Sequence, residues 1–137
     1  MDINKKLINL AIEARKKAYT PYSKFNVGAC LLCKNGEIYT GCNIENASLT
    51  PTVCAERTAI FKAISEGNKD FKKIVVVGGK NEKLNDFCAP CGVCRQVISE
   101  FVNDNFEIIL AINENNYKVY NFRRDIFPLG FTKDDLD

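Results

Sequence analysis

Histidine is absent from this chain of 137 residues. The side chain that most often binds metals and moves protons near neutral pH is therefore missing, and any such chemistry must use other residues. Long apolar runs are also lacking, since none approaches the roughly 20 residues that cross a bilayer. The net charge is only +2, and Lys and Arg occur as scattered pairs, which does not favour a nucleic-acid-binding face.

Cysteine, in contrast, is abundant, with seven residues. The number is odd, and the chain begins with a pattern typical of an amphipathic helix, not of a secretory signal. We therefore expect reduced thiols and metal ligands in a cytoplasmic protein, not a disulfide framework. The length and a hydrophobic content of 46% predict a single domain over residues 1–137 with a substantial core.

Hydrophobic periodicity predicts the secondary structure. Three helices are expected over residues 3–18, 54–66 and 91–102, with a short acidic helix near the C-terminus. Five strands are expected over residues 25–32, 38–42, 73–77, 106–112 and 117–122, with Gly78-Gly79 ending the third. Asn35-Gly36 is typical of a hairpin between the first two strands. A hairpin followed by alternating strands and helices predicts an α/β fold, with three α/β/α layers around a central mixed five-stranded sheet.

Three cysteines stand at the starts of predicted helices. Cys54 follows a loop that contains Pro51, Cys91 follows Pro90, and Cys94 lies on the first turn of the same helix as Cys91. Free N–H groups and the helix dipole favour thiolates at such positions. Three thiolates at about 2.3 Å can bind Zn²⁺ and leave its fourth position for water, as in hydrolytic zinc enzymes. We therefore expect one Zn²⁺ per subunit on these three cysteines.

Other interpretations of the cysteines stay open at this point. Cys91 and Cys94 alone fit a redox pair. A structural zinc ribbon could use Cys30 and Cys33, although these lie on a predicted strand. Cys88 extends the Cys91–Cys94 pair into a run that resembles the start of an iron–sulfur site, but the Cys-Pro that continues the bacterial pattern is missing.

Charged residues near the cysteines could assist the chemistry. Glu56 is a candidate for moving protons, although a first-turn glutamate is also favoured by the helix dipole alone. Residues two apart in a regular helix point away from each other, so Glu56 reaches the metal only if the first turn is set across it. Three thiolates leave negative charge on a zinc site, and Arg57 or Arg95 could donate hydrogen bonds to the sulfurs.

The segments Cys54-Ala-Glu-Arg-Thr-Ala59 and Pro90-Cys-Gly-Val-Cys-Arg-Gln96 resemble the small, tetrameric class of three-cysteine cytidine deaminases. Residues 19–29, 41–47 and 127–131 extend the resemblance over nearly the whole chain. It implies a zinc hydrolase that converts cytidine and 2′-deoxycytidine to uridine and 2′-deoxyuridine plus ammonia in pyrimidine salvage. It also implies the cytidine deaminase fold and a homotetramer with active sites at subunit interfaces, without nucleic-acid or membrane partners.

The resemblance also implies a role for each site residue. Cys54, Cys91 and Cys94 would bind the zinc, and Glu56 would carry a proton from zinc-bound water to ring N3 and then to the leaving ammonia. Five residues would contact the nucleoside: Phe25 against the pyrimidine, Asn43 and Glu45 on the ribose hydroxyls, the backbone N–H of Ala55 on the base, and Phe131 from a neighbouring subunit.

The chain departs from the family pattern at Leu49, where tyrosine is common, and at Val93, where alanine is usual. The loop of residues 48–53 is otherwise atypical, so details of substrate fit could differ. Blasticidin S deaminases share the zinc motifs, but Asn43 and Glu45 favour a ribose-bearing substrate. A nucleic-acid-editing deaminase would carry a His ligand and a basic face, and a non-catalytic zinc scaffold would not need Glu56 together with Asn43 and Glu45.

Overall fold

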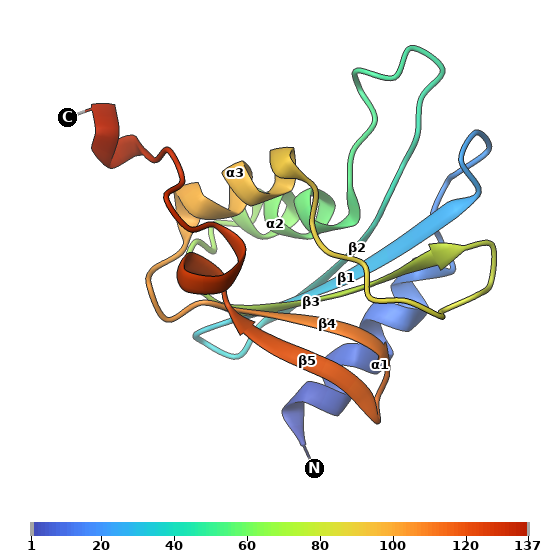
Figure 1. Ribbon diagram of the computed structural model, residues 1–137, viewed down its shortest axis with the longest axis horizontal. Helices are drawn as coiled ribbons and strands as arrows, with labels where there is room; N and C mark the ends of the chain where they lie inside the picture. The colour runs from blue at the N-terminus through green and yellow to red at the C-terminus, as the bar shows by residue number, and fades with distance from the viewer. Residues whose placement is uncertain (1, 137) are drawn as a thin grey trace.

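The computed structural model describes residues 2–136, which form a central sheet with helices on both of its faces (Figure 1). The five strands lie in the order β2-β1-β3-β4-β5. They span Phe25–Cys33 (β1), Ile38–Cys42 (β2), Phe71–Lys80 (β3), Glu107–Asn113 (β4) and Asn116–Asn121 (β5). The helices span Ile3–Arg15 (α1), Ala55–Ser65 (α2) and Gly92–Phe101 (α3), followed by a π-helical turn, Phe122–Ile126 (η1), and a 3-10 turn, Lys133–Leu136 (η2).

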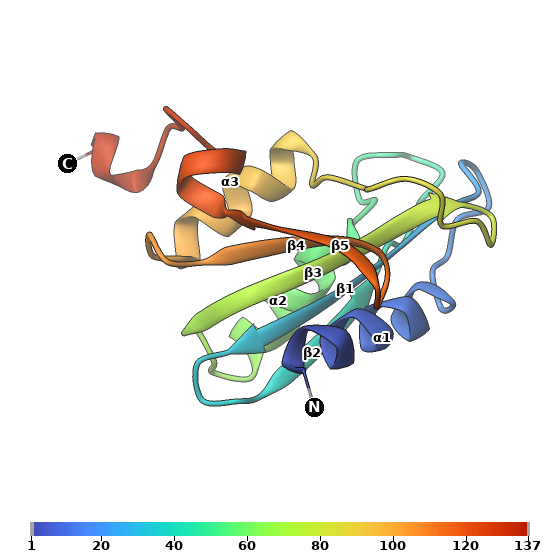
Figure 2. The same cartoon turned by 60° about the horizontal axis from the view of Figure 1, so that its bottom comes forward.

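The sheet is mixed, as the order of elements predicts. β1 runs antiparallel to both β2 and β3, β3 runs parallel to β4, and β5 closes the far edge antiparallel to β4. Helix α1 covers one face, and α2 and α3 cover the other (Figure 2). The predicted three-layer α/β/α architecture is therefore confirmed.

Alternation along the central strands creates two cores. In β3, Ile74 and Val76 pack in the core beneath α2 and α3, while Val75 and Val77 pack in the core beneath α1. All four are fully buried, so both faces of this strand are covered. Strands buried on both faces read as continuous apolar runs, which is why Lys-Ile-Val-Val-Val is visible as a strand in the sequence. Within residues 2–136, no helix combines the length and apolar character needed to cross a membrane.

Two element boundaries differ by three residues from those predicted, and the others agree within two residues. Gly78-Gly79 does not end the third strand, because β3 continues to Lys80 and pairs Gly78 with Val27 and Gly79 with Asn26. A Cβ on Gly78 would lie 2.8 Å from the Cys88 sulfur, so this glycine permits a close approach within a strand and does not interrupt it. Helix α1 ends at Arg15, earlier than residue 18, and its last turn closes as a backbone turn through Lys17.

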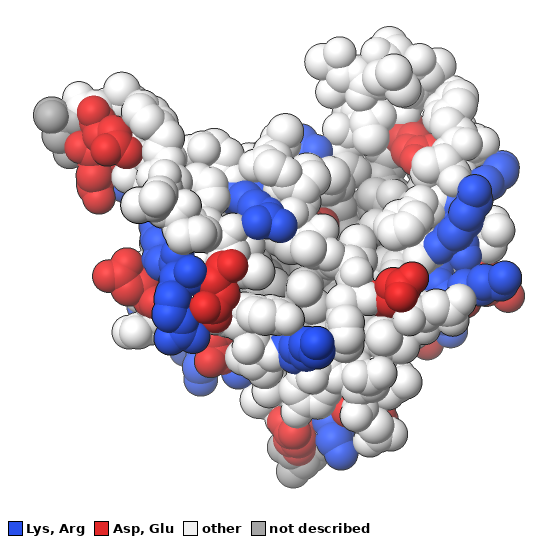
Figure 3. All heavy atoms as spheres, in the orientation of Figure 1, with Lys and Arg blue, Asp and Glu red and all other residues white. Residues whose placement is uncertain are grey.

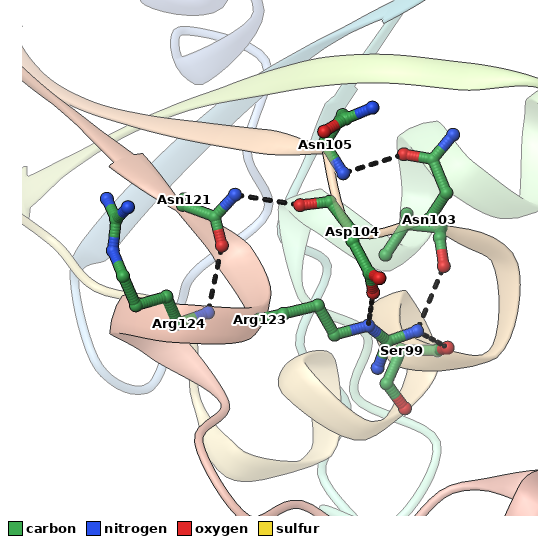
Figure 4. Close-up of polar contacts among 8 residues, drawn as sticks. Ser99, Asn103, Asp104, Asn105, Asn121, Arg123 and Arg124 are labelled. Atoms are coloured by element: carbon green, nitrogen blue, oxygen red, sulfur yellow. Dashed lines mark hydrogen bonds and ion pairs between the residues drawn. The ribbon is translucent and has the colours of Figure 1, made fainter.

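The η1 turn has no counterpart in the predicted elements, because a single π-helical turn lacks a recurring apolar period. Its Arg123 donates from Nη2 to the carbonyl oxygens of Ser99 and Val102, each at 2.9 Å (Figure 4). These carbonyls lie at the C-terminal end of α3, where backbone acceptors lack helical partners. The η1 turn therefore closes α3 at the end opposite to Cys91.

We expect Gly41→Ala to destabilise the fold, because helix α2 lies very close to β2 at this glycine. An added Cβ would lie 2.5 Å from the Ala55 carbonyl oxygen and 2.6 Å from the Ala59 nitrogen, both backbone atoms that cannot move independently. Overpacking of this kind costs about 1–3 kcal/mol. Urea unfolding at saturating zinc would measure the loss, and Gly92→Ala, where an added Cβ meets nothing within 4 Å, is the control. Equal stability of the two variants would contradict the expectation.

Candidate active site

Three cysteine sulfurs meet where the N-termini of α2 and α3 come together. Cys54 is the N-cap residue of α2 and Cys91 that of α3, and neither side chain makes a capping hydrogen bond to the backbone of its helix. Both sulfurs are therefore free to face each other, at 3.7 Å, while Cys94 comes from the first turn of α3. All three sulfurs lie within 4.8 Å of one another, and no other group of potential metal ligands of this kind occurs in residues 2–136.

The cluster fits one zinc ion. Tetrahedral Zn–S bonds of about 2.3 Å place neighbouring sulfurs roughly 3.8 Å apart, close to the Cys54–Cys91 separation. Thiolates are soft ligands that suit zinc, and three of them leave one coordination position free. The predicted zinc site on Cys54, Cys91 and Cys94 is confirmed in this sense: the three thiols converge as a set suited to one ion.

Hydrogen bonds prepare the cluster for a cation. Those from Cys94 and from Arg57 lower the pKa of the Cys54 thiol, which favours its thiolate form. Arg57 Nη2 lies 3.2 Å from the Cys54 sulfur, and its Nε is buried without a protein partner. Arg95, the other candidate, instead donates to the carbonyl oxygens of Pro90 and Ile126 and does not support the sulfurs.

A cavity of about 220 Å³ opens beside the sulfurs. Figure 3 shows the surface hollowed between two projections, which Figure 1 identifies as the C-terminal segment and the loop after β2. The volume is below the roughly 300–1,000 Å³ of sites that enclose drug-sized ligands, so it suits a single small ring. The lining residues come from β1, the segment after β2, the start of α2 and the segment before α3: Ser23, Phe25, Val27, Asn43, Cys54, Glu56, Cys88, Ala89 and Cys91.

Glu56 lines this cavity although only 3% of its surface is exposed. The first turn of α2 is thus set across the cluster, so that Cys54 and Glu56 reach the same space although they are two residues apart. Burial raises the pKa of Glu56 to about 7. A carboxyl group with such a pKa can both accept and donate a proton near neutral pH, which is the property of a general acid–base catalyst.

Phe25, at the start of β1, and Asn43, directly after β2, also line the cavity. The Asn43 side chain bridges backbone groups of β1: its Oδ1 accepts from Val27 N at 2.9 Å, and its Nδ2 donates to Phe25 O at 2.8 Å. These two bonds hold the amide in one orientation. One N–H and one lone pair of the Asn43 side chain remain available to a ligand.

Glu45 does not line the cavity but organises the turn beside it. Its Oε1 accepts from the backbone N–H groups of Tyr22 and Ser23 at 3.1 and 3.2 Å, and its Oε2 accepts from the Ser23 hydroxyl. The bond from Ser23 lowers the pKa of Glu45, which keeps the carboxylate charged. Ser23 lines the cavity, so Glu45 is connected to the cavity through its hydrogen bonds to Ser23.

The structure leaves two further predicted contacts, besides Glu45, outside the cavity lining of this chain. Ala55 is fully buried at the start of α2 and offers only its backbone. Phe131 is 57% exposed in the C-terminal segment, which leads away from the body of the molecule (Figure 1). Four lining residues were not predicted from the sequence: Ser23, Val27, Cys88 and Ala89. Cys88 and Ala89 adjoin a cysteine motif, and Ser23 and Val27 lie in the segment 19–29 that extends the family resemblance, but neither signal assigns a role to these four residues.

The structure also decides between the other interpretations of the cysteines. Cys30 and Cys33 are buried in β1 and cannot form a zinc ribbon with Cys91 and Cys94. Cys88 is not part of the sulfur cluster, which removes the support for an iron–sulfur run. The partner of the Cys91–Cys94 pair is Cys54, so the three sulfurs form one metal-binding unit.

We expect Arg57→Gln to weaken zinc retention and turnover together. The substitution removes the cation that bonds to the Cys54 sulfur, and loss of such supporting contacts typically costs about 10- to 100-fold in metal affinity or activity. Competition against a chromophoric chelator would measure the zinc affinity. Arg124→Gln, which removes an exposed Arg–Asp125 pair, is the matched control. Unchanged zinc retention in Arg57→Gln would refute the supporting role.

Comparison with known proteins agrees with this geometry. Residues 1–110 match the family described as the cytidine and deoxycytidylate deaminase zinc-binding region. The chain is 45% identical to a cytidine deaminase of Sporosarcina psychrophila over 99% of this chain and 96% of that protein. A crystal structure of cytidine deaminase from Burkholderia pseudomallei matches with a TM-score of 0.82 at 42% identity, covering 92% of this chain and 97% of that one. A blasticidin-S deaminase of Bacillus cereus is 34% identical over 93% of this chain and 91% of its own length. The chain therefore belongs to the zinc-binding cytidine deaminase family.

Proposed function

We propose that this protein catalyses the hydrolytic deamination of cytidine and 2′-deoxycytidine to uridine and 2′-deoxyuridine. The observation that carries the proposal is the joint opening of the three-thiol cluster and buried Glu56 onto one cavity that suits a single ring. The family membership and the cytidine deaminases among its relatives support the same reaction. The substrate would be a free nucleoside, as required in pyrimidine salvage.

The reaction replaces the amino group of the base by an oxygen from water and releases ammonia. When bound to Cys54, Cys91 and Cys94, zinc would supply Lewis-acid activation of water. Glu56 is the one carboxylate among the residues that line the cavity, so it would move the protons. It accepts a proton from the attacking water, delivers it to ring N3, and then assists the departure of the amino group as ammonia.

Two lining residues, Phe25 and Asn43, and two residues beside the cavity, Glu45 and Ala55, would bind and orient the nucleoside. Phe25 offers an apolar ring to the pyrimidine, and the Ala55 backbone N–H at the start of α2 is free to donate to the base. Asn43 has one donor and one acceptor left for a ribose hydroxyl. Glu45 would bind a second hydroxyl, in competition with the bonds that it makes to residues 22 and 23. We propose these contacts from the resemblance and from the placement of the side chains.

We further propose a homotetramer in which Phe131 of one subunit completes the site of another. The isolated chain presents Leu129 and Phe131 on an exposed segment, and its cavity is open on one side. Exposed apolar side chains grouped in this way are typical of surfaces that other chains cover. Each chain would act as a single domain with one zinc. Seven free thiols suit a reducing compartment, which supports a cytoplasmic location.

We expect Glu56→Gln to retain zinc and fold but to lose about 10²–10⁴ of the rate, the usual contribution of a positioned acid–base group. The assay follows the ultraviolet spectrum of cytidine and 2′-deoxycytidine as the cytosine band gives way to that of uracil. Glu66→Gln, an exposed carboxylate at the end of the same helix, is the control and should retain activity. Near-normal turnover by Glu56→Gln would refute the shuttle role.

The same assay separates the proposal from its rivals. Blasticidin S is offered in parallel, because a blasticidin-S deaminase is among the relatives and the loop with exposed Leu49 departs from the family pattern. Conversion of blasticidin S but not of cytidine would contradict the proposed substrate and indicate that this protein acts on blasticidin S. A zinc-loaded, folded protein that converts neither would favour a non-catalytic scaffold.

Mixing two inactive variants tests the shared site. Glu56→Gln lacks the shuttle but retains Phe131, whereas Phe131→Ala retains Glu56 but lacks the ring that a neighbour would supply. If subunits exchange and Phe131 acts between them, hybrids of the two variants contain some complete sites, and activity rises above that of either variant alone. Leu136→Ala, another exposed apolar residue of the same segment, is expected to remain active by itself. Absence of any gain after verified subunit exchange would contradict the shared site.

A further inference from the structure

Arg15 is a buried cation that the proposed chemistry does not use. It lies at the end of α1 with 6% of its surface exposed, and its guanidinium contacts backbone carbonyl oxygens. Nε donates to Asn26 O at 2.8 Å, and Nη2 contacts the carbonyl oxygens of Gly79, Asn81 and Lys83 at 2.7, 2.6 and 3.0 Å. One side chain therefore joins α1 to the start of β1, the end of β3 and the segment that follows β3.

Two glycines allow this close arrangement. A Cβ on Gly28 would lie 2.0 Å from the Ala11 carbonyl oxygen and 2.7 Å from the Arg15 nitrogen, so α1 lies directly against β1. A Cβ on Gly79 would lie 1.9 Å from the Lys83 carbonyl oxygen and 3.4 Å from Arg15 Nη2. The backbone after β3 thus turns back over Gly79 and presents its carbonyl groups to the guanidinium.

The contacted segment forms part of the active-site wall. Residues 81–91 contain no helix or strand, and they lead from β3 to the N-cap of α3. Cys88 and Ala89 of this segment line the cavity, and Cys91 at its end belongs to the sulfur cluster. The Arg15 contacts lie at the beginning of the segment, and the bond from Arg95 to Pro90 O lies at its end.

The backbone conformation around Arg15 requires support. Asn81 and Lys24 both have positive φ angles, of 56° and 61°, and Asn81 N donates to Lys24 O at 2.6 Å. A positive φ is disfavoured for a long side chain such as lysine and persists only where surrounding contacts hold it. Arg15 bonds to the backbone on both sides of this contact, at Asn26 and Asn81.

We propose that Arg15 is a positioning residue for the deaminase site, acting through residues 81–91 and through the start of β1. It holds the wall formed by Cys88 and Ala89 at a set distance from the wall formed by Phe25 and Val27, and so determines the width of the cavity. A guanidinium suits this task because its planar donors reach several carbonyl groups at once, which an ammonium cannot do in the same geometry. The catalytic consequence rests on the proposed function, whereas the structural consequence does not.

The test compares Arg15→Met with Lys73→Met. Lys73 is a second buried cation on the α1 face, bonded to Asn4 Oδ1 at 3.1 Å and paired with Glu107 at 3.4 Å, and it lies at the other end of β3. Both variants lose a cation that joins α1 to the sheet, but only Arg15→Met frees residues 81–91. Zinc content, thermal midpoint, kcat and KM for cytidine, and amide hydrogen exchange of residues 81–91 are measured on each zinc-loaded protein.

For Arg15→Met we expect faster exchange in residues 81–91 and a fall in kcat/KM of about 10- to 100-fold, carried mainly by KM, since misplacement on the order of 1 Å can cost about 10²-fold. Arg15→Lys should recover part of both effects. Lys73→Met should change the thermal midpoint but neither the exchange of this segment nor KM. If Arg15→Met does not fold, Arg15→Lys is compared with the wild-type protein instead, and hydrogen exchange of residues 81–91 and KM for cytidine are measured in the same way.

Two results would overturn the proposal: unchanged exchange in residues 81–91, or equal KM values in the Arg15 and Lys73 variants at matched stability. Hydrogen exchange is independent of turnover, so it separates this proposal from the proposed function. A wild-type protein that does not deaminate cytidine would remove the function, while accelerated exchange in Arg15→Met would still identify Arg15 as the residue that holds this wall.

Discussion

Three sulfurs within 4.8 Å of one another are the constraint on which the rest of this structure depends. Thiols held so close tend to ionise one at a time, since each new thiolate repels the next, and here Cys54 carries the stabilised charge. The cluster therefore demands a cation. Arg57 supplies one positive group from the protein, and the geometry fits a zinc ion that would neutralise the rest. Because its ligands come from two helix N-termini, metal binding and the packing of α2 against α3 are one event.

This constraint explains why Glu56 can be buried. A carboxyl group with 3% of its surface exposed resists ionisation, and in a simple core it would only destabilise the fold. At the N-terminus of α2 the helix N–H groups favour its charged form, and a zinc ion bound to the cluster would do the same, whereas the Cys54 thiolate by itself opposes it. Burial raises its pKa to about 7, although the side chain still lines the cavity. The desolvation that is costly for stability thus becomes useful for proton transfer.

Much of the fold could be predicted from the sequence, because its signals are local. The helix starts at Cys54 and Cys91 follow from the residues before them, and the buried strand around Val75 follows from an unbroken apolar run. The prediction that Gly78-Gly79 ends the third strand was wrong, because a glycine that permits a close approach and a glycine that ends a strand look alike in sequence. Only the register against β1 distinguishes them. The zinc ligands could be predicted because two short motifs carry them, whereas Ser23 and Val27 reach the cavity through pairing of distant segments, which no local pattern records.

The α1 layer lies on the face of the sheet away from the sulfur cluster, and it contributes to the site through Arg15. The α1 side of the sheet contains no metal ligand, and its core is apolar apart from this cation and Lys73. Loops over an active site need mobility for substrate entry, yet a cavity suited to a single ring tolerates little change in width. Backbone carbonyl groups bonded to one guanidinium reconcile these two requirements, because the Arg15 bonds hold the first residues of the segment and do not extend to Cys88 and Ala89. The active-site wall is thus positioned from behind the sheet, by a helix whose own sequence pattern indicates only packing.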